Sequence, residues 1–373
     1  MADSGSSQSG QPRSIAADAQ AILLYSLAPS AFHKLKAVLH LHQLSFSEPL
    51  PNTVLVATDA DIVSQAVGQW REGLTSAELA EVRGALLSTP RPSSEDLARA
   101  QPRLADLDAL LGQLQGRWLL RVLEADSFFI MFQPLVSVAE RRTVAYECLL
   151  RARENWAVIG AERLLSTARL MGLTRQLDHA AWGKAVMQGR DIVHEGYSLF
   201  INFTPSSIYD RRFGLLDTME ICQKHGVQFD RLVFEVTEAE QVRDLTRLKN
   251  MIREYRSEGA KVALDDLGSG YSSILHLTEL QPDYVKLDQE LVRGAHNDYV
   301  RSVLLKAVTD AAHELGIFVV AEGVETEEDL KFCIAIDADF AQGYFLAQPA
   351  EVPPVVSPEA LKTLAEWTRD VEP

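Results

Sequence analysis

Short apolar runs recur along most of the chain and alternate with longer amphipathic stretches. From about residue 125 the runs have the length of strands, and the stretches between them repeat apolar residues every three or four positions, as helices do. The runs are residues 128–136, 143–151, 197–205, 231–238, 261–268, 283–288, 317–325 and 340–346. Eight strands that alternate with helices are typical of an α/β barrel, so we predict a TIM-like (β/α)8 barrel over residues 125–355. A doubly wound open sheet is the structural alternative, because periodicity alone does not show whether a sheet closes.

The first quarter of the chain shows a smaller pattern of the same kind. Residues 1–19 are rich in Ser, Gly, Gln and Ala and are predicted to be a disordered tail. Residues 20–90 contain two strand-like runs, AILLYSL and NTVLVAT, and two helix-like stretches, FHKLKAVLHLH and IVSQAVGQWREGL. We interpret this part as a small α/β module. It has no glycine-rich phosphate loop and no metal-ligand spacing, so we expect it to be a regulatory module of unknown type.

A connecting segment, residues 93–124, follows the module. A helix is predicted to begin near Pro102, because proline is favoured in the first turn of a helix. Its apolar positions have heptad spacing: Leu104, Leu107, Leu111, Leu114 and Trp118. Two interpretations fit this spacing, an amphipathic helix that packs on its own domain and a signalling helix that pairs across a dimer. Beyond the barrel, residues 356–373 are predicted to be a C-terminal helix and tail.

Composition and charge restrict the class of protein. Hydrophobic residues make up 47% of the 373 residues, which is enough for a sizeable core and excludes wholesale disorder. The formal net charge is −16, so neither a nucleic acid polymer nor an anionic membrane is expected as the main partner. A small anionic ligand is compatible with this charge if metal ions neutralise its site.

The cysteines and the start of the chain indicate a compartment. Cys148, Cys222 and Cys333 have no paired spacing, which suits a reducing cytosol and excludes a zinc site built from these cysteines alone. The opening residues MADSGSSQSG lack the basic and apolar regions of a signal peptide. No apolar run approaches the ~18 residues of a membrane span. We therefore expect a cytoplasmic protein without a membrane span.

Each of the eight predicted strands carries a polar or charged residue at or near its C-terminal end. In chain order these residues are Gln133, Glu147, Asn202, Glu235, Asp265 with Asp266, Lys286, Glu322 and Gln342. The strands of a parallel barrel are covered on both faces and should be apolar, and burying an unpaired carboxylate is costly. Barrel active sites lie at the mouth formed by the C-terminal ends of the strands. We therefore expect these side chains to converge there.

The residue types favour a site for hard metal ions. Glu, Asn and Asp offer oxygen ligands, which suit Mg²⁺, Mn²⁺ or Ca²⁺ better than zinc, and crowded carboxylates repel one another without cations. Asp265 and Asp266 can both reach the mouth if the chain turns at the strand end, and one carboxylate shared by two ions is usual in two-metal phosphoryl chemistry. Lys286 is expected to polarise the attacking water or to stabilise charge on a phosphate. A structural salt bridge between Lys286 and Asp288 is the alternative.

Eight segments of the chain resemble the successive motifs of the EAL family. YECLLR resembles the signature that gives the family its name, with Glu147 as the acid and Cys148 in place of the usual alanine, and FQPLV resembles the strand that opens the domain. The other six segments are INFTP, FEVTE, DDLGSGYSS, DYVKLD, VVAEGVET and AQGYFLAQP. They occur in the family's order and at compatible spacing over about residues 125–350, which makes the resemblance highly specific.

The resemblance implies a role for each matching residue. Metal binding is implied for Glu147, Asn202, Glu235, Asp265, Asp266 and Glu322. The implied catalytic set is Glu147, Lys286, Glu322, Gln342, Glu238 and Glu325, in which Lys286 contacts the nucleophilic water, Glu238 anchors the loop after the fifth strand and Glu325 is a further acid around the site. Arg151 matches the arginine that holds a substrate phosphate, and Gln133 and Asp178 match substrate contacts.

The resemblance also implies an activity. EAL enzymes open cyclic di-GMP to linear pGpG with two Mg²⁺ or Mn²⁺ ions, are inhibited by Ca²⁺ and commonly dimerise. We therefore expect a metal-dependent, cyclic-guanylate-specific phosphodiesterase that is a homodimer and is regulated by its N-terminal module. The alternative is an effector module that binds cyclic di-GMP without hydrolysing it. Such members typically lose metal acids, and none is lost here, which favours the enzyme.

Two segments depart from the family's usual pattern. In DDLGSGYSS, Leu267 and Ser269 replace the commoner phenylalanine and threonine, while Gly268 and Gly270 are retained, so the backbone freedom of the loop is kept. Residues 151–178 are shorter and less family-like than usual. The implied substrate contacts therefore rest on weaker similarity than the implied metal ligands.

Overall fold

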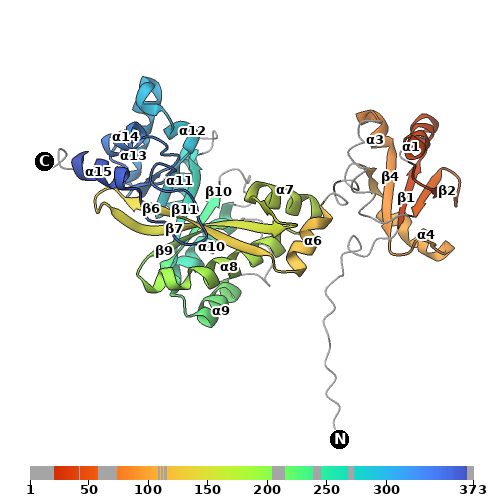
Figure 1. Cartoon of the computed structure of the whole chain (residues 1–373), viewed down its shortest axis with the longest axis horizontal. Helices are drawn as coiled ribbons and strands as arrows, with labels where there is room; N and C mark the ends of the chain where they lie inside the picture. The colour runs from red at the N-terminus through yellow and green to blue at the C-terminus, as the bar shows by residue number, and fades with distance from the viewer. Residues whose placement is uncertain are drawn as a thin grey trace, which may run out of the picture. The chain divides into compact units, whose positions relative to one another are not determined.

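The chain divides into two compact units, residues 1–125 with 165–173 and residues 126–164 with 174–373 (Figure 1). The computed structural model describes residues 21–41, 43–57, 74–107, 110, 112, 116–203, 215–237, 245–267 and 273–367. The predicted N-terminal tail lies outside these residues. No helix within the described ranges is long and apolar enough to cross a membrane.

A five-stranded antiparallel sheet forms the first unit, in the order β2-β3-β1-β4-β5. Its strands are β1 Ala21–Ser26, β2 Phe46–Ser47, β3 Thr53–Ala57, β4 Val82–Leu87 and β5 Ala105–Asp106. The two predicted strands, β1 and β3, are present and pair with each other. The sequence pattern missed β4, because Arg83 and Gly84 interrupt its apolar run.

Helices complete the first unit and confirm the predicted small α/β module. They are α1 Pro29–Leu41, α3 Ser76–Glu81, α4 Ser94–Ala100, the 3-10 helix η1 Gln101–Arg103 and α6 Arg117–Glu124. Leu35 and Leu39 lie four residues apart, on one face of α1, and are buried in one core cluster with Ile22 and Leu24 of β1. The second predicted helix, at residues 62–74, lies outside the described residues except for its last position.

The predicted continuous helix from near Pro102 to Trp118 is wrong. Pro102 lies in the short helix η1, and Ala105–Asp106 form β5, which pairs with β4. Leu104 has an extended backbone and packs against one core cluster of the unit, and Leu107 is fully buried in another. These two leucines therefore pack within their own unit, and the next two heptad positions lie outside the described residues.

A closed eight-stranded barrel forms the second unit. The order around it is β6-β14-β13-β12-β11-β10-β9-β7, and the ring closes because β7 pairs with β6. The strands are β6 Phe128–Ser137, β7 Arg142–Glu154, β9 Ser198–Phe203, β10 Leu232–Thr237, β11 Lys261–Leu267, β12 Tyr284–Leu287, β13 Phe318–Ala321 and β14 Phe340–Ala341. All eight predicted strands are present, and closure excludes the open doubly wound sheet.

The first strand departs from the expectation of a wholly parallel barrel. β6 is antiparallel to both of its neighbours, β7 and β14. Residues 138–141 join β6 to β7, and such a short turn can connect only antiparallel strands, since a parallel connection needs a crossover of a dozen or more residues. β7 continues past the barrel and pairs with an additional strand, β8 Ala157–Ile159.

Helices follow the strands and surround the barrel (Figure 1). They are α8 Thr174–His194, α9 Leu215–His225, α10 Leu245–Ser257, α11 Ser273–Leu280, α12 Gln289–Val292, α13 Tyr299–Glu314, α14 Glu327–Ala335 and α15 Pro358–Trp367, with 3-10 helices η3 Phe229–Arg231 and η4 Ala295–Asn297. A further helix, α7 Ala161–Met171, belongs to the first unit from Leu165 on. Strand side chains that face outward pack with the helices in one core. Phe203 stacks on Trp182 of α8 at 5.2 Å between ring centroids, and Phe234 meets Tyr255 of α10 edge to face at 4.8 Å.

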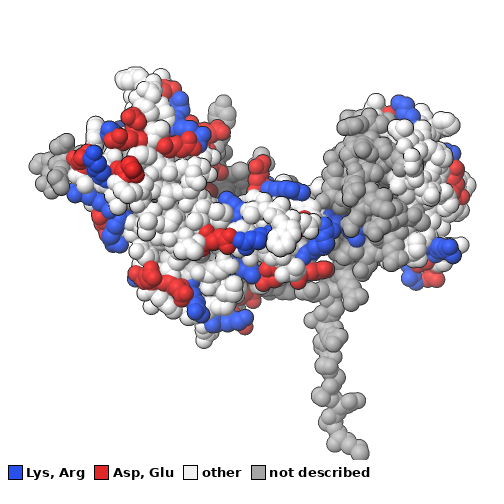
Figure 2. All heavy atoms as spheres, in the orientation of Figure 1, with Lys and Arg blue, Asp and Glu red and all other residues white. Residues whose placement is uncertain are grey.

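Charged side chains of both signs are interspersed on the face of the molecule drawn in Figure 2. Among the described residues on that face, no continuous basic surface is visible.

The backbone beyond β14 approaches its neighbour too closely for any side chain at residue 343. A Cβ on Gly343 would lie 2.1 Å from the carbonyl oxygen of Val324. The same backbones are joined by hydrogen bonds from Val324 N to Gln342 O at 3.1 Å and from Phe345 N to Val324 O at 3.0 Å. We therefore expect Gly343→Ala to lower the free energy of unfolding by about 1–3 kcal/mol, measured by chemical denaturation.

Gly183→Ala on α8 is the matched control, because a Cβ there meets nothing within 4 Å. It should leave stability unchanged or raise it by up to about 1 kcal/mol, since alanine is the better helix former. Equal stability of the Gly343→Ala variant and the wild type would contradict the close approach described here.

Candidate active site and metal centre

Side chains along a strand point alternately into and out of the barrel, and the inward-pointing side chains form two layers. The first is apolar: Leu135, Ala145, Phe200, Val233, Ala263, Tyr284 and Val320 form a separate buried cluster, with Phe340 packed against it. Each apolar residue of this layer has a polar residue two positions away in the sequence, on the same face of the strand. These polar residues are Gln133, Glu147, Asn202, Glu235, Asp265, Lys286, Glu322 and Gln342. We call these eight residues the polar ring. Every strand of the barrel contributes one member.

The antiparallel first strand still supplies its member to the polar ring. Gln133 precedes Leu135 by two positions, whereas in the other strands the polar residue follows the apolar one, because β6 runs in the opposite direction. Gln133 and Glu147 lie in the middle of their strands and are paired in register. The prediction that they stand at strand ends is therefore wrong, although the prediction that the polar residues converge is confirmed.

A cavity of about 280 Å³ opens at the polar ring. Six ring members line it: Gln133, Glu147, Asp265, Lys286, Glu322 and Gln342. Glu235 is fully buried beneath them. Asn202 joins the ring through a hydrogen bond from its Nδ2 to Glu147 Oε1 at 3.2 Å.

Lys286 is the centre of the polar ring. Its side chain is 1% exposed, and its Nζ lies 2.6 Å from Glu322 and 2.8 Å from Glu235. Two further carboxylates surround the same nitrogen, Asp265 at 3.3 Å and Glu147 at 3.6 Å. No ion pair between Lys286 and Asp288 is recorded among the described residues; Asp288 instead caps α12 by accepting from Glu290 N. The alternative prediction, a structural salt bridge between Lys286 and Asp288, is therefore wrong.

Burial and charge shift the pKa values in the ring in opposite directions. Burial alone would lower the pKa of Lys286, but the surrounding carboxylates, Asp265 foremost, raise that pKa well above its usual value. Burial raises the pKa of Glu235 well above its usual value, although Lys286 partly opposes this. Burial likewise raises the pKa of Glu322 to about 8 and that of Asp266 to about 6. Without a cation, burial therefore favours the protonated forms of Glu235 and Glu322 near neutral pH.

Two side-chain amides hold Glu147 in position. Gln342 Nε2 donates to Glu147 Oε2 at 2.7 Å and to Gln133 Oε1 at 3.2 Å. Asn202 donates to the other oxygen of Glu147. Both oxygens of this carboxylate therefore have fixed directions, and its lone pairs are already oriented before any ligand binds.

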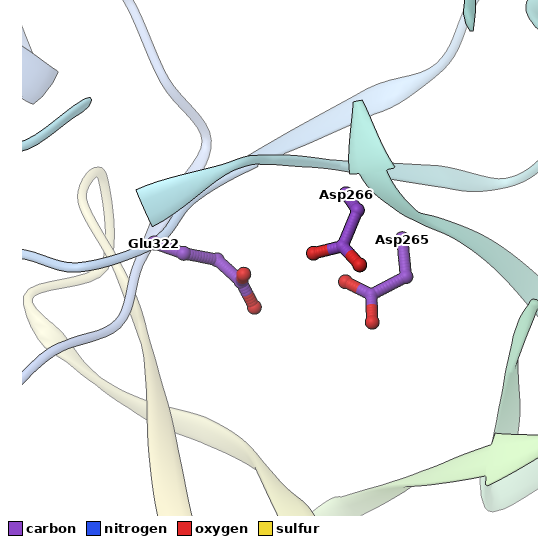
Figure 3. Close-up of side chains that lie close together, drawn as sticks. All are labelled: Asp265, Asp266 and Glu322. Carbon is purple, nitrogen blue, oxygen red and sulfur yellow. The ribbon is translucent and has the colours of Figure 1, made fainter. Parts of the chain in front are cut away.

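The backbone turns sharply between the two neighbouring aspartates. Asp266 has φ 57°, in the left-handed region that residues other than glycine seldom occupy, and the pairing of β11 with β12 shifts register between Leu264 and Leu267. The side chains of Asp265 and Asp266 consequently point the same way, toward Glu322 (Figure 3). One carboxylate oxygen from each of the three acids lies within 4.8 Å of the others. The predicted turn at this strand end is confirmed.

The polar ring fits divalent cations on three grounds. Glu235 Oε2 and Gln342 Oε1 are buried and accept no hydrogen bond, so both have unused lone pairs. The four carboxylates of the ring, together with the neighbouring Asp266 and the ammonium of Lys286, leave four negative charges when all are ionised, which two divalent cations would balance. The donors are carboxylate and amide oxygens, as hard cations prefer.

The other predicted site residues lie in different surroundings. Glu325 lines the cavity and pairs with Arg293. Arg151 is half-buried on β7 and donates to the carbonyl of Leu150, and Asp178 is buried on α8; neither is among the described residues that line the cavity. Glu238 lies outside the described residues.

Cys148, beside Glu147, belongs to the core around the barrel rather than to the ring. It is buried with outward-facing residues, and burial raises the pKa of its thiol well above the usual value. Burial therefore disfavours the reactive thiolate form of this cysteine.

Among the residues that line the cavity, sequence reasoning missed three with polar or aromatic side chains: Gln289, Arg293 and Tyr344. Each lies after the end of a strand, in α12 or in a loop, where no apolar alternation marks which side chains face the barrel mouth. Their nearness to Lys286 and Gln342 in the sequence was the only signal.

A closed α/β barrel whose mouth carries a ring of acids and amides around a lysine is the architecture that this chain presents. The sequence profile of the EAL domain matches residues 116–349, more than half of the chain, and the chain therefore belongs to the EAL domain family. This finding confirms the resemblance drawn from the eight motifs.

Several proteins of this family are similar to the chain. Cyclic di-GMP phosphodiesterase PdeF of Escherichia coli K12 is 28% identical over 74% of this chain and 36% of its own length. Cyclic di-GMP phosphodiesterase PA2567 of Pseudomonas aeruginosa is 28% identical over 73% of this chain and 44% of its own length. The chain thus spans less than half the length of these curated relatives.

A solved structure matches the barrel. The standalone EAL protein from Vibrio cholerae O395, crystallised in a c-di-GMP-bound form, is 32% identical, with a TM-score of 0.57 over 62% of this chain and 97% of that chain. The likeness supports the barrel fold for the second unit.

The raised pKa values generate a prediction for the stability of the metal-free protein. Because the pKa of Glu322 is about 8 in the fold and 4.5 when unperturbed, its contribution to stability is present at low pH and is lost as pH rises through about 8. In EDTA, the unfolding temperature should therefore fall between pH 6 and pH 8.5. Added Mg²⁺ replaces the retained proton, so the increase in unfolding temperature on adding Mg²⁺ should be larger at pH 8.5 than at pH 6.

Glu322→Gln is the control, because it removes this titration and should shrink the difference between the two pH values. A Mg²⁺-induced increase that is equal at both pH values in the wild type, or larger at pH 6, would contradict the account.

Proposed function

We propose that this protein hydrolyses cyclic di-GMP to linear pGpG with two divalent cations, Mg²⁺ or Mn²⁺. The observation that carries the proposal is the completeness of the polar ring: all eight strands retain an acid, an amide or the lysine. The names of the relatives PdeF and PA2567 support the substrate and the reaction, and the c-di-GMP-bound Vibrio cholerae protein supports the ligand.

The two cations would be held by overlapping sets of ligands. We assign Glu147, Asn202, Glu235 and Asp265 to one ion, and Asp265, Asp266 and Glu322 to the other. Bound there, the ions supply Lewis acidity and neutralise charge on the phosphodiester. Ca²⁺ would bind the same oxygens but prefers more ligands and looser geometry than Mg²⁺, in keeping with the inhibition that the family resemblance implies.

The residues of the chain orient the reactants. The surrounding carboxylates raise the pKa of Lys286 in the metal-free structure, so its Nζ is a donor that would hydrogen-bond to water or to a phosphate oxygen. Gln342 and Asn202 hold both oxygens of Glu147, which keeps this ligand oriented through the reaction. Hydrolysis places the oxygen of water on phosphorus, breaks the P–O3′ bond and leaves a proton on O3′.

Several further roles are proposals that rest on the family resemblance. Gln133, Arg151 and Asp178 contact the substrate, and Glu238 anchors the loop that follows β11, the fifth strand of the barrel. The first unit regulates the barrel, and the protein is a cytoplasmic homodimer.

We expect Glu147→Gln to lower hydrolysis of cyclic di-GMP by at least about a hundredfold, because the change removes a charged metal ligand whose position two amides fix. The fold should persist, since the side chain lines the cavity and not the core. Product pGpG is quantified by chromatography after incubation with Mg²⁺ or Mn²⁺, and circular dichroism checks the fold.

Glu140→Gln is the matched control, because Glu140 is an exposed acid in the turn before β7 that pairs only with Arg142 among the described ion pairs. It should retain full activity. If the wild-type protein binds cyclic di-GMP but yields no pGpG with either ion, the hydrolase proposal fails and the non-hydrolytic effector takes its place.

A further inference from the structure

One buried carboxylate outside the polar ring joins two segments that follow adjacent strands of the barrel. Asp329 lies in the first turn of α14, is 1% exposed and is not among the described residues that line the cavity. The first segment, residues 288–298, follows β12, which carries Lys286. The second, residues 322–326, follows β13 and begins with Glu322. We call them the β12 segment and the β13 segment.

The two oxygens of Asp329 are divided between these segments. Oδ1 accepts from Gly294 N at 2.9 Å and lies 3.3 Å from His296 Nδ1, both in the β12 segment. Oδ2 accepts from Thr326 Oγ1 at 2.9 Å, from Thr326 N at 3.1 Å and from Glu325 N at 3.3 Å, all in the β13 segment. The carboxylate therefore bridges the two segments.

Capping of α14 accounts for only one of these oxygens. Thr326 and Asp329 form a capping box, in which the side chain of each accepts from the backbone of the other. On Asp329 this box uses Oδ2. The bond from Gly294 to Oδ1 adds nothing to the cap, because Gly294 lies 35 residues earlier in the chain. The carboxylate therefore has a second role, which involves the β12 segment.

Hydrogen bonding favours the charged form of Asp329. Burial opposes the charge, but hydrogen bonds from Gly294, Thr326 and Glu325 together lower the pKa of this carboxyl group below its usual value. Hydrogen bonds to a charged acceptor are about twice as strong as those between neutral groups. The bridge between the two segments is therefore made of charge-assisted hydrogen bonds.

The bridge lies just beyond the point where the pairing of the two strands ends. That pairing reaches Leu287 on β12, and one more backbone bond follows, from Glu322 N to Leu287 O at 3.3 Å. Farther along, Arg293 of the β12 segment pairs with Glu325 of the β13 segment, but both side chains are exposed, and exposed ion pairs contribute little. Asp329 provides the buried connection between the segments.

The place of Glu322 determines the shape of the second metal site. One carboxylate oxygen of Glu322 lies within 4.8 Å of oxygens of Asp265 and Asp266. Both aspartates belong to β11, whereas Glu322 lies one residue beyond the end of β13. The position of Glu322 relative to the aspartates therefore depends on what holds the β13 segment.

We infer that Asp329 is a positioning residue of the metal centre, which bridges the β12 and β13 segments and so keeps Glu322 within reach of the second divalent cation. It acts through Glu322 and is not itself a ligand. The inference rests on the proposed function, because the ion is the second of the two assigned there.

Titration with Mn²⁺, followed by the electron paramagnetic resonance signal of free Mn²⁺, gives a dissociation constant for each ion. Asp266→Asn identifies the second ion, because Asp266 is assigned to that ion alone. Asp329→Asn keeps the size of the side chain, but its amide nitrogen cannot accept a hydrogen bond, so one segment loses its acceptor. It should weaken the second ion about tenfold and the first by less than about twofold, as expected when a ligand loses the partner that orients it.

Asp329→Glu separates positioning from capping. Glutamate is the usual acid of a capping box, so this variant retains the charge and the start of α14. Its carboxylate lies one methylene farther out and cannot bond to Gly294 and the β13 segment in the same geometry. It should weaken the second ion by a similar factor. Wild-type affinity for both ions in Asp329→Glu would show that capping alone matters and would overturn the inference.

Thr326→Ala is the matched control. It removes the hydroxyl that caps α14 and should lower the unfolding temperature, while the backbone bonds from Gly294, Glu325 and position 326 to Asp329 remain. Both dissociation constants should stay within about twofold of the wild type. If Thr326→Ala weakens the second ion as much as Asp329→Asn does, the effect comes from the stability of α14 and the inference is overturned.

Circular dichroism checks that each variant is folded, and Asp329→Glu decides the question if Asp329→Asn unfolds. Unchanged binding of both ions by the Asp329 variants, or equal weakening of both ions, would overturn the inference alone. Failure of the wild-type protein to bind Mn²⁺ would instead overturn the metal centre of the proposed function, and the inference with it.

Discussion

The burial of Lys286 among carboxylates is the constraint on which the rest of the site depends. An ammonium that is 1% exposed needs partners, and four acids lie within 3.6 Å of its Nζ. One positive charge cannot balance so many acids, so the surplus must be neutralised by protons or by cations. In the absence of metal ions, protons neutralise part of the surplus, as the raised pKa values of Glu235 and Glu322 indicate. Bound divalent cations would neutralise it instead. A ring with this excess charge destabilises a purely structural core, which is why we interpret it as a functional site.

The alternation of side chains along strands accounts for most of what the sequence predicted. Tyr284 and Lys286, or Val233 and Glu235, are two residues apart, so an apolar layer and a polar layer follow directly from the pattern. The direction of β6 could not be read from its sequence, because FFIMFQPLV is almost wholly apolar and buried on both faces. The heptad prediction failed because leucines spaced by three and four also suit separate short elements that pack into one core. Gln289, Arg293 and Tyr344 escaped prediction because residues that follow the strand ends carry no periodic signal. Glu238 lies outside the described residues.

Tight backbone geometry at the strand ends brings the polar ring together. Two ring members are followed by glycines: Gly323, with φ 68°, leaves no room for a Cβ beside Gln289, and Gly343 packs against Val324. Asp266 adopts a left-handed conformation without being glycine, which stores local strain next to two metal-ligand candidates. In each case the chain turns abruptly just where a functional side chain must point inward. The barrel core supports these turns, since the apolar layer below them is fully packed.

Counting the bound ions tests the central claim most directly. The account holds that the surplus charge around Lys286 exists to bind two divalent cations that share Asp265. Titration with Mn²⁺, followed by electron paramagnetic resonance, reports both the number of ions and whether they are close enough to couple magnetically. The account predicts two Mn²⁺ ions per chain with the spectrum of a coupled pair, as expected for ions about 3.5–4 Å apart. A single ion per chain, or two that do not couple, would contradict it.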